Sequence, residues 1–184
     1  GSDVHSLNRD ALGLSSRDIA KTFFYAFIYG AGDQKLGKIL GGGAKRGKQG
    51  RAALLSGVSG LMELTDRVKQ VFRRRGHLIG LDGRKLHIRS EHSALNTLLQ
   101  SAGAILMKKA LILLDERLKK HYKEGDYEFV ANIHDEFQIE VKEEYAEDIA
   151  SHAAESIHRA GQYFEFGCPL SATSHIGKTW AETH

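Results

Sequence analysis

Four side chains that could bind a nucleotide recur at every fourth position of one short segment: Arg17, Lys21, Tyr25 and Tyr29. On an α-helix each step of four residues passes a full turn by only about 40°, so the four side chains form one row. Cations one turn apart suit the oxygens of a triphosphate, and aromatic rings further along suit a sugar and a base. The spacing therefore predicts a helix that binds a nucleoside triphosphate.

A second segment could bind a metal ion. Asp135 and Glu136 follow His134 and stand between two short apolar runs, 129–133 and 137–141. Carboxylate oxygens are the ligands that hard divalent cations prefer. A helix that binds a polyanion, together with a metal-binding carboxylate, indicates nucleotidyl transfer. Each segment also has a plainer interpretation, as solvated cations on an amphipathic helix and as a polar turn between two strands.

Both segments resemble motifs of the family-A DNA polymerases. Arg-x3-Lys-x3-Tyr-x3-Tyr-Gly over residues 17–30 resembles motif B, and His134-Asp135-Glu136 resembles motif C. Further stretches are similar to the T-odd phage branch of the family, namely residues 29–33, 80–87, 95–104 and 180–184. The resemblance implies a DNA-directed DNA polymerase that uses Mg²⁺ in a two-metal site. It implies primer–template DNA and deoxynucleoside triphosphates (dNTPs) as its partners.

The resemblance also implies roles for single residues of both motifs. Asp135 is the expected metal ligand. Glu136 is expected to tune the metal site or to contact the primer end, and His134 is expected to hold the primer terminus. Arg17 and Lys21 are expected to grip the triphosphate, and Lys21 is also expected to protonate the leaving pyrophosphate.

Three more nucleotide contacts are implied near the first motif. Tyr25 is expected to border the 3′ side of the sugar, where Tyr in place of Phe is associated with acceptance of dideoxynucleotides. Tyr29 is expected to stack near the templating base, as aromatic rings do with unpaired bases. His5 lies in an Asp-Val-His sequence 12 residues before Arg17 and is expected to contact the triphosphate.

A third row, at the same spacing of four, consists of His92, Asn96 and Gln100. By resemblance these side chains are expected to reach the minor-groove acceptors of the primer–template, which are nearly the same for every base pair. Such contacts check base-pair geometry without reading sequence. Polar residues on a helix face with no ligand are the alternative interpretation.

The elements that must position these residues are predicted from periodicity and from helix-terminating signals. Ser15 or Ser16 is the expected N-cap of the helix at 17–29, Gly30 and Gly32 its expected end, and Gly76 the expected end of a later helix. The expected helices are 3–14, 17–29, a pattern from 54 to 71, 93–120 and 143–160, with a break at 41–43. The expected strands are 86–88, 129–133, 137–141 and 168–176, the second and third forming a hairpin with residues 134–136 at or near its bend.

These elements indicate an α+β fold. By resemblance, residues 1–77 form a helical fingers subdomain, and residues 78–184 form the C-terminal half of a polymerase palm with an antiparallel sheet. The result is an incomplete right-hand polymerase fold. Motif A, with the second metal-binding Asp, and the thumb are not found in the sequence. The resemblance therefore implies a further partner, an N-terminal polypeptide that carries motif A, and it predicts that the chain alone is inactive.

Charge is distributed unevenly along the chain, although the net charge is only +3. Residues 35–89 contain 14 Lys and Arg against three acids, a net charge of +11, whereas residues 110–170 contain 14 acids against six bases, a net charge of −8. A dense basic surface attracts phosphate backbones. Cys168 is the single cysteine, which excludes intrachain disulfides. Without a secretory signal or an apolar run of about 20 residues, we expect a cytoplasmic protein that contacts no membrane.

Three other functions are compatible with parts of the pattern. The chain could belong to a single-subunit phage-type RNA polymerase, but Tyr25 and Glu136 favour DNA synthesis. It could be a non-catalytic nucleic-acid-binding module that keeps the polymerase fold, but the joint presence of Arg17, Lys21, Tyr25 and Asp135 argues against this. A metal hydrolase built on His134 and Asp135 would lack further ligands at useful spacing.

Overall fold

The computed structural model describes residues 4–183, apart from the side chains of Val4, His5 and Leu7. The chain forms two compact units, Gly1–Gln100 and Ser101–His184. The predicted boundary between fingers and palm, at residues 77 and 78, falls inside the first unit, and the subdomain assignment remains a prediction.

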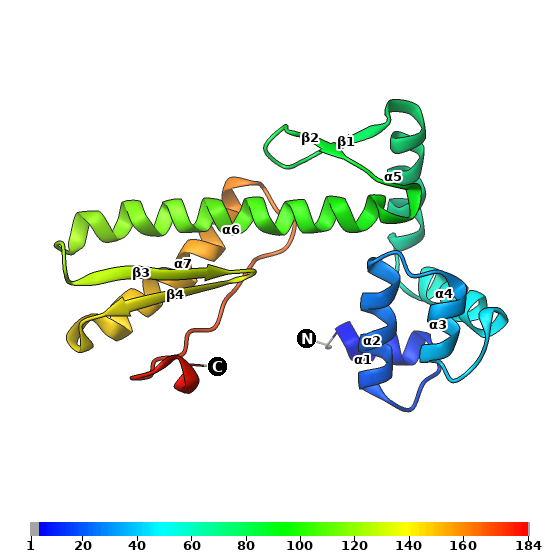
Figure 1. The fold of residues 1–184 in the computed structure, drawn as a ribbon, viewed down its shortest axis with the longest axis horizontal. Coiled ribbons are helices and arrows are strands. Elements are labelled where there is room, and N and C mark those ends of the chain that lie inside the picture. Colours follow the sequence, from blue (N-terminus) through cyan, green and yellow to red (C-terminus); the bar gives the residue numbers. More distant parts are fainter. Residues whose placement is uncertain (1–3, 184) are drawn as a thin grey trace. The chain divides into compact units, whose positions relative to one another are not determined.

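The first unit is mainly helical (Figure 1). Its described elements are α1 (Val4–Ala11), α2 (Arg17–Ile28), α3 (Asp33–Ile39), α4 (Ala44–Gly57), α5 (Leu61–Arg75), the antiparallel hairpin of β1 (His77–Ile79) and β2 (Lys85–His87), and a 3₁₀ turn at Glu91–Ser93. The long helix α6 (Ala94–His121) begins in this unit and continues into the second.

Local sequence fixes both ends of α2. The predicted N-cap is confirmed, because the Ser16 hydroxyl accepts a hydrogen bond from the Ile19 N–H at 3.3 Å. At the other end Gly30 takes a positive φ of 77°, and the N–H of Ala31 donates to the Ala26 carbonyl at 2.9 Å. This Schellman arrangement favours glycine, since other residues adopt a left-handed φ only at a cost.

Glycine also allows α3 and α4 to pack at very short range. A Cβ atom on Gly47 would lie 1.9 Å from the Asp33 carbonyl oxygen, and one on Gly37 would lie 2.0 Å from the Gly43 carbonyl oxygen. No real side chain fits at either position. The two helices are therefore held backbone against backbone, joined by the turn at residues 41–43.

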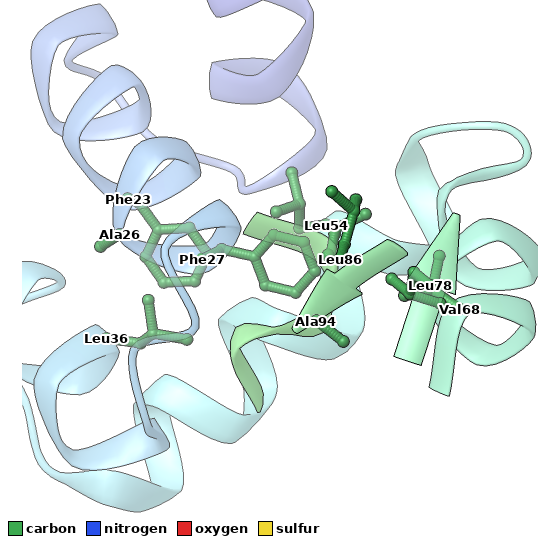
Figure 2. Close-up of a cluster of buried hydrophobic side chains, with 10 residues drawn as sticks. Phe23, Ala26, Phe27, Leu36, Leu54, Val68, Leu78, Leu86 and Ala94 are labelled. Atoms are coloured by element: carbon green, nitrogen blue, oxygen red, sulfur yellow. The ribbon is translucent and has the colours of Figure 1, made fainter. Parts of the chain in front are cut away.

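One hydrophobic cluster holds the first unit together (Figure 2). Phe23 and Phe27 of α2 lie among aliphatic side chains from the helices and from the β1–β2 hairpin. The labelled members are Phe23, Ala26, Phe27, Leu36, Leu54, Val68, Leu78, Leu86 and Ala94. Burial of one whole side of α2 in this cluster leaves its other side facing solvent.

The second unit consists of the rest of α6, the antiparallel pair β3 (Tyr127–Ile133) and β4 (Glu136–Val141), and α7 (Ala146–Tyr163), with 3₁₀ turns at Glu143–Tyr145 and Trp180–Glu182. The hairpin pairs Tyr127 with Val141 and Phe129 with Ile139, and a bulge interrupts the ladder between Phe129 and Ala131. Its aromatic and aliphatic side chains pack against Leu114, Leu118 and Ile149 of α6 and α7. The predicted hairpin is confirmed.

Two predicted elements are wrong. The pattern from 54 to 71 is two helices, because Val58 leaves the helical conformation with φ −109° and ψ 107° and Gly60 takes φ 77° before α5 begins. Residues 168–176 form no strand. In the described part of the chain β3 and β4 pair only with each other, so neither strand pairs with this segment. An extended segment without a pairing partner does not form a ladder.

Helix α6 also corrects the expectation that the chain has no apolar segment long enough to cross a membrane. Segment Glu91–His121 is long and apolar enough to cross a membrane by length and composition. A core helix of a soluble protein meets the same criterion, and α6 buries Leu106, Met107 and Ala110 in one cluster and Leu114 and Leu118 in another. Packing within the second unit therefore accounts for part of its apolar character.

Candidate functional site

The predicted nucleotide-binding row lies on the exposed side of α2. Arg17, Lys21, Tyr25 and Tyr29 are all solvent-exposed, whereas Ala20, Phe23, Ala26 and Phe27 are buried. The rings of Tyr25 and Tyr29 stack with their centroids 6.4 Å apart and their planes 23° apart. The row thus offers cations at the start of the helix and a pair of stacked rings at its end.

Lys21 is the clearest open cation of the row. Among the described residues its ammonium group forms no ion pair, and its side chain is exposed. An ammonium group in this position can bind a phosphate oxygen without first breaking a protein contact. It can also donate a proton to a leaving oxyanion.

An interaction that the sequence did not reveal holds the segment just after α2. The Arg51 guanidinium donates to the Asp33 carboxylate and to the Ala31 carbonyl, both at 2.7 Å, and its central carbon lies 5.6 Å from the centre of the Phe27 ring. Arg51 therefore fixes the turn that follows Tyr29. In the sequence it is one more base in a basic stretch, and only the fold brings it to α2.

The end of α2 also touches the turn that carries His92. A Cβ atom on Gly30 would lie 2.4 Å from the His92 carbonyl oxygen, so the two backbones are in direct contact. Glu91, the preceding residue, accepts two hydrogen bonds from the Arg73 guanidinium at 2.6 and 2.7 Å. A glycine at position 30 is thus required both by its φ and by this close approach.

The predicted minor-groove row is only partly exposed. His92 lies in the 3₁₀ turn and Gln100 on α6, and both are exposed, while Asn96 is half-buried. The amide oxygen of Asn96 is buried and has no hydrogen-bond partner among the described residues. A buried acceptor without a donor costs about 1–3 kcal/mol, and the minor-groove acceptors that this row is expected to reach supply no donor for it.

The predicted metal-binding segment forms a tight bend between β3 and β4. Ile133 pairs with Glu136, which leaves His134 and Asp135 as a two-residue loop. His134 has a φ of 54°, a left-handed conformation uncommon outside glycine. Both loop side chains are exposed. The bend therefore presents the Asp135 carboxylate to solvent.

Glu136 is half-buried and accepts a hydrogen bond from the amide of Gln138, two residues further along β4. Residues two apart on a strand lie on the same face of the sheet. The contact orients the Glu136 carboxylate, and nothing in the linear sequence singles out Gln138 for this role.

The remaining predicted contact, His5, lies outside the described side chains. The structure also separates the predicted residues between two units. His92, Asn96, Gln100 and the α2 row belong to the first unit, and His134, Asp135 and Glu136 belong to the second.

Known proteins with similar sequences are DNA polymerases. The chain is 39% identical to the DNA-directed DNA polymerases of Enterobacteria phage T3 and Escherichia phage T7 over 99% of its length, and 41% identical to that of Escherichia phage Phieco32. It spans 29–30% of the length of these relatives.

A solved structure shows the same fold. The chain matches the POL domain of Pol1 from M. smegmatis, solved in complex with DNA primer-template and dNTP, with a TM-score of 0.77 at 22% sequence identity. The match covers 87% of this chain and 31% of that chain. The family model "DNA polymerase family A" matches residues 1–182, nearly the whole sequence. The chain belongs to DNA polymerase family A.

Proposed function

We propose that the chain is the part of a template-directed DNA polymerase that binds the incoming dNTP and supplies one catalytic metal ligand. One observation carries the proposal. A chain of this family exposes two cations at the start of α2 and a carboxylate at the β3–β4 bend. In phosphoryl transfer the side chains mainly position the reactants and neutralise the charge on the phosphates.

The α2 row would handle the nucleotide. Arg17 and Lys21 would bind the triphosphate oxygens, and Lys21 would give a proton to the departing pyrophosphate. Tyr25 would lie beside the sugar and Tyr29 near the templating base. Because 12 residue steps separate Arg17 from Tyr29, the row spans about 18 Å at 1.5 Å per residue, enough for a triphosphate and a nucleoside in an extended pose.

The second unit would contribute to the metal site. Its described residues fit one part of a Mg²⁺ site, because Asp135 offers an exposed carboxylate with Glu136 next to it. No group of three or more His, Cys, Asp or Glu side chains among the described residues could hold a metal ion by itself. When bound, Mg²⁺ would neutralise charge on the reacting phosphates and activate the primer hydroxyl. Asp135 would hold the ion, and His134 would orient the primer end.

We further propose that an N-terminal polypeptide carrying motif A completes the enzyme. The chain spans less than a third of its phage relatives. In the second unit, the described strands β3 and β4 have no third partner, and a groove of about 1780 Å³ runs beside them. Its apolar lining includes Phe137, Ile139, Ile157 and Ile176. A polypeptide that paired with a free sheet edge and filled this groove would bring the second carboxylate.

The primer–template would contact the chain at His92, Asn96 and Gln100. The Asn96 amide N–H would donate to such an acceptor, whereas its buried oxygen is itself an acceptor and takes no part in the contact. We retain the division into a fingers subdomain, residues 1–77, and a C-terminal palm part, residues 78–184. We expect this synthesis to take place in the cytoplasm of a bacterial or phage-infected cell.

The test is primer extension with a labelled primer on four templates that differ in the first unpaired base. The chain alone, with Mg²⁺ and all dNTPs, should add no nucleotide. Mixed with the N-terminal polypeptide, it should add only the complementary nucleotide on each template. Extension by the chain alone would overturn the incomplete-site proposal. Addition that ignored the template base, or none in the mixture, would overturn the proposed function.

A further inference from the structure

The helix pair α3–α4 carries a group of cations that the proposed active site does not use. Between Asp33 and Glu63 the sequence has six bases and no acid, a net charge of +6 over residues 34–62. One of the six, Arg51, is paired with Asp33. The other five side chains are exposed, and we call them the α3–α4 cationic surface: Lys35, Lys38, Lys45, Arg46 and Lys48.

These five cations have no neutralising partner in the described part of the chain, where no ion pair or charged hydrogen bond involves any of them. Two other arginines of the first unit are neutralised, because Arg73 is paired with Glu91 and Arg84 with Asp82, at 2.6 Å in both cases. Like charges three positions apart on a helix, such as Lys35 with Lys38 and Lys45 with Lys48, repel each other. An external polyanion would relieve that repulsion.

The fold gathers the five cations around one turn. Lys38 stands near the end of α3, and Lys45 and Arg46 lie in the first turn of α4. Lys35 and Lys48 lie one turn further from the loop on their helices. The glycine contacts between α3 and α4 fix the spacing of the two helices, so the cations are held on a rigid base.

The turn itself leaves room for a ligand. A Cβ atom on Gly41 or on Gly43 would meet nothing within 4 Å, and only Gly42 is covered, by the side chain of Arg46. The surface therefore has bare backbone at its centre and cations on both sides. Spread-out cations of this kind suit a chain of phosphates better than one phosphate, which convergent donors bind more tightly.

We propose that the α3–α4 cationic surface binds the phosphate backbone of DNA, as a contact additional to the dNTP-binding row on α2. The inference deepens the proposed function and rests on it for the choice of DNA as the nucleic acid. The phosphates could belong to the single-stranded template ahead of the primer or to a duplex. Both share the chemistry that the surface recognises.

The test compares two triple variants of the full chain in DNA binding across a series of salt concentrations. The first, Lys45→Ala/Arg46→Ala/Lys48→Ala, removes three charges from the surface. The second, Lys108→Ala/Arg117→Ala/Lys120→Ala, removes three exposed charges from α6 and is the control. Alanine favours helix at all six positions, so both variants should fold, which circular dichroism checks.

Each lost phosphate contact lowers the slope of log K against log salt by about 0.9 for duplex and about 0.7 for single-stranded DNA. We expect the surface variant to lose about 2 in slope, and about tenfold or more in affinity at low salt, on at least one of the two DNAs. We expect the α6 control to keep the wild-type slope. The arm that shows the loss identifies the single-stranded template or the duplex as the ligand.

An unchanged slope on both DNAs, or an equal loss in both variants, would overturn the proposal. A variant that fails to fold is replaced by Lys45→Gln/Arg46→Gln/Lys48→Gln, for which the same outcomes apply. Failure of this surface is separable from failure of the proposed function, because primer extension is scored independently and depends on Asp135. If the surface variant lost slope but the mixture with the N-terminal polypeptide showed no templated extension, the surface would bind DNA and the proposed polymerase function would be wrong.

Discussion

The two units expose charged side chains of opposite sign by different structural means. In the first unit the cations of α2 project from a helix whose other side is buried, with a cap at each end. In the second unit Asp135 stands in a two-residue loop next to a residue with positive φ. A helical row tolerates change at one position because its neighbours stay in place, whereas a tight bend depends on the register of the whole hairpin.

The comparison indicates a division of chemical work. Residues 35–89 carry a net charge of +11 and residues 110–170 a net charge of −8. Cations suit the binding of phosphates, and carboxylates suit the binding of the metal that activates them. Changes in the first unit should therefore affect mainly nucleotide and DNA binding, and changes at the bend mainly the rate of the chemical step.

The largest effect is expected at the bend. Asp135→Ala should lower the turnover of the polymerase reconstituted with the N-terminal polypeptide by at least about a hundredfold, since the lost ligand acts in the transition state. DNA binding should change little. Glu140→Gln, at another exposed carboxylate of the same hairpin, is the control and should leave turnover unchanged. A loss below about tenfold in Asp135→Ala would exclude Asp135 as a metal ligand.

Two helix glycines should respond to alanine in opposite directions, one in each unit. Gly47→Ala should destabilise the chain by about 2–3 kcal/mol, because its Cβ would overlap the Asp33 backbone. Gly103→Ala should stabilise by about 1 kcal/mol, since its Cβ position is open and alanine favours helix. Urea unfolding measures both. A Gly47→Ala chain as stable as the wild type would contradict the close packing of α3 against α4.

At the start of α2, Arg17→Ala and Lys21→Ala should each raise the KM for dNTP by about tenfold, because each loses a charged hydrogen bond to the triphosphate. The affinity for primer–template should stay within about twofold. Thr22→Ala, an exposed neighbour on α2, is the control. If DNA affinity collapsed while the KM for dNTP held, the row would be a DNA contact and not a nucleotide site.

Acid should weaken the second unit through Asp126. The hydrogen bond from the Lys142 ammonium, followed by that from the Lys123 N–H, holds the pKa of the Asp126 carboxyl below its usual 3.8. A depressed carboxyl pKa stabilises the folded state above the unfolded pKa, and this contribution is lost as the pH falls through the folded pKa. Asp126→Asn should lower the urea midpoint at pH 7.

As the pH falls below about 3.8, the midpoints of Asp126→Asn and the wild type should approach each other. Glu128→Gln, at an exposed neighbour, serves as the control. A constant difference between Asp126→Asn and the wild type from pH 7 to pH 3 would show that packing, and not ionisation, is what the substitution removes.

The smallest effect is expected at Tyr25. Tyr25→Phe should reduce the use of dideoxynucleotides relative to dNTPs by a few-fold or more, since Phe has no hydroxyl group that could stand in for the 3′ hydroxyl that a dideoxynucleotide lacks. Use of natural dNTPs should hardly change. A competition assay on the reconstituted enzyme measures the ratio, and an unchanged ratio would place Tyr25 away from the sugar.

The parts of the fold that the sequence predicted are those set by neighbours in the chain. The row on α2 follows from a period of four, its start from Ser16 and its end from Gly30, and the hairpin around Asp135 follows from two apolar runs. All of these signals act within a few residues. Of the residues that the motifs named, the row on α2 is exposed and so are His134 and Asp135, whereas Glu136 is half-buried.

What the sequence did not predict depends on contacts between distant residues. Arg51 reaches Asp33 across 18 positions, and Arg73 reaches Glu91 across the same number. The apolar residues on both sides of Val58 recur with helical spacing, so the sequence pattern predicted one helix where the structure has a break before α5. Residues 168–176 have strand-like composition, but a strand needs a partner, and the described residues provide none.

Single-turnover incorporation by the reconstituted polymerase, measured over a range of dNTP concentrations, tests the division of work between the units most directly. It separates the apparent Kd for dNTP from the maximal rate of incorporation. We predict that Arg17→Ala raises the Kd with a smaller loss of rate, and that Asp135→Ala lowers the rate at least about a hundredfold at saturating dNTP. Equal effects of both variants on the Kd and on the rate, or an unchanged rate in Asp135→Ala, would contradict this division of work between the units.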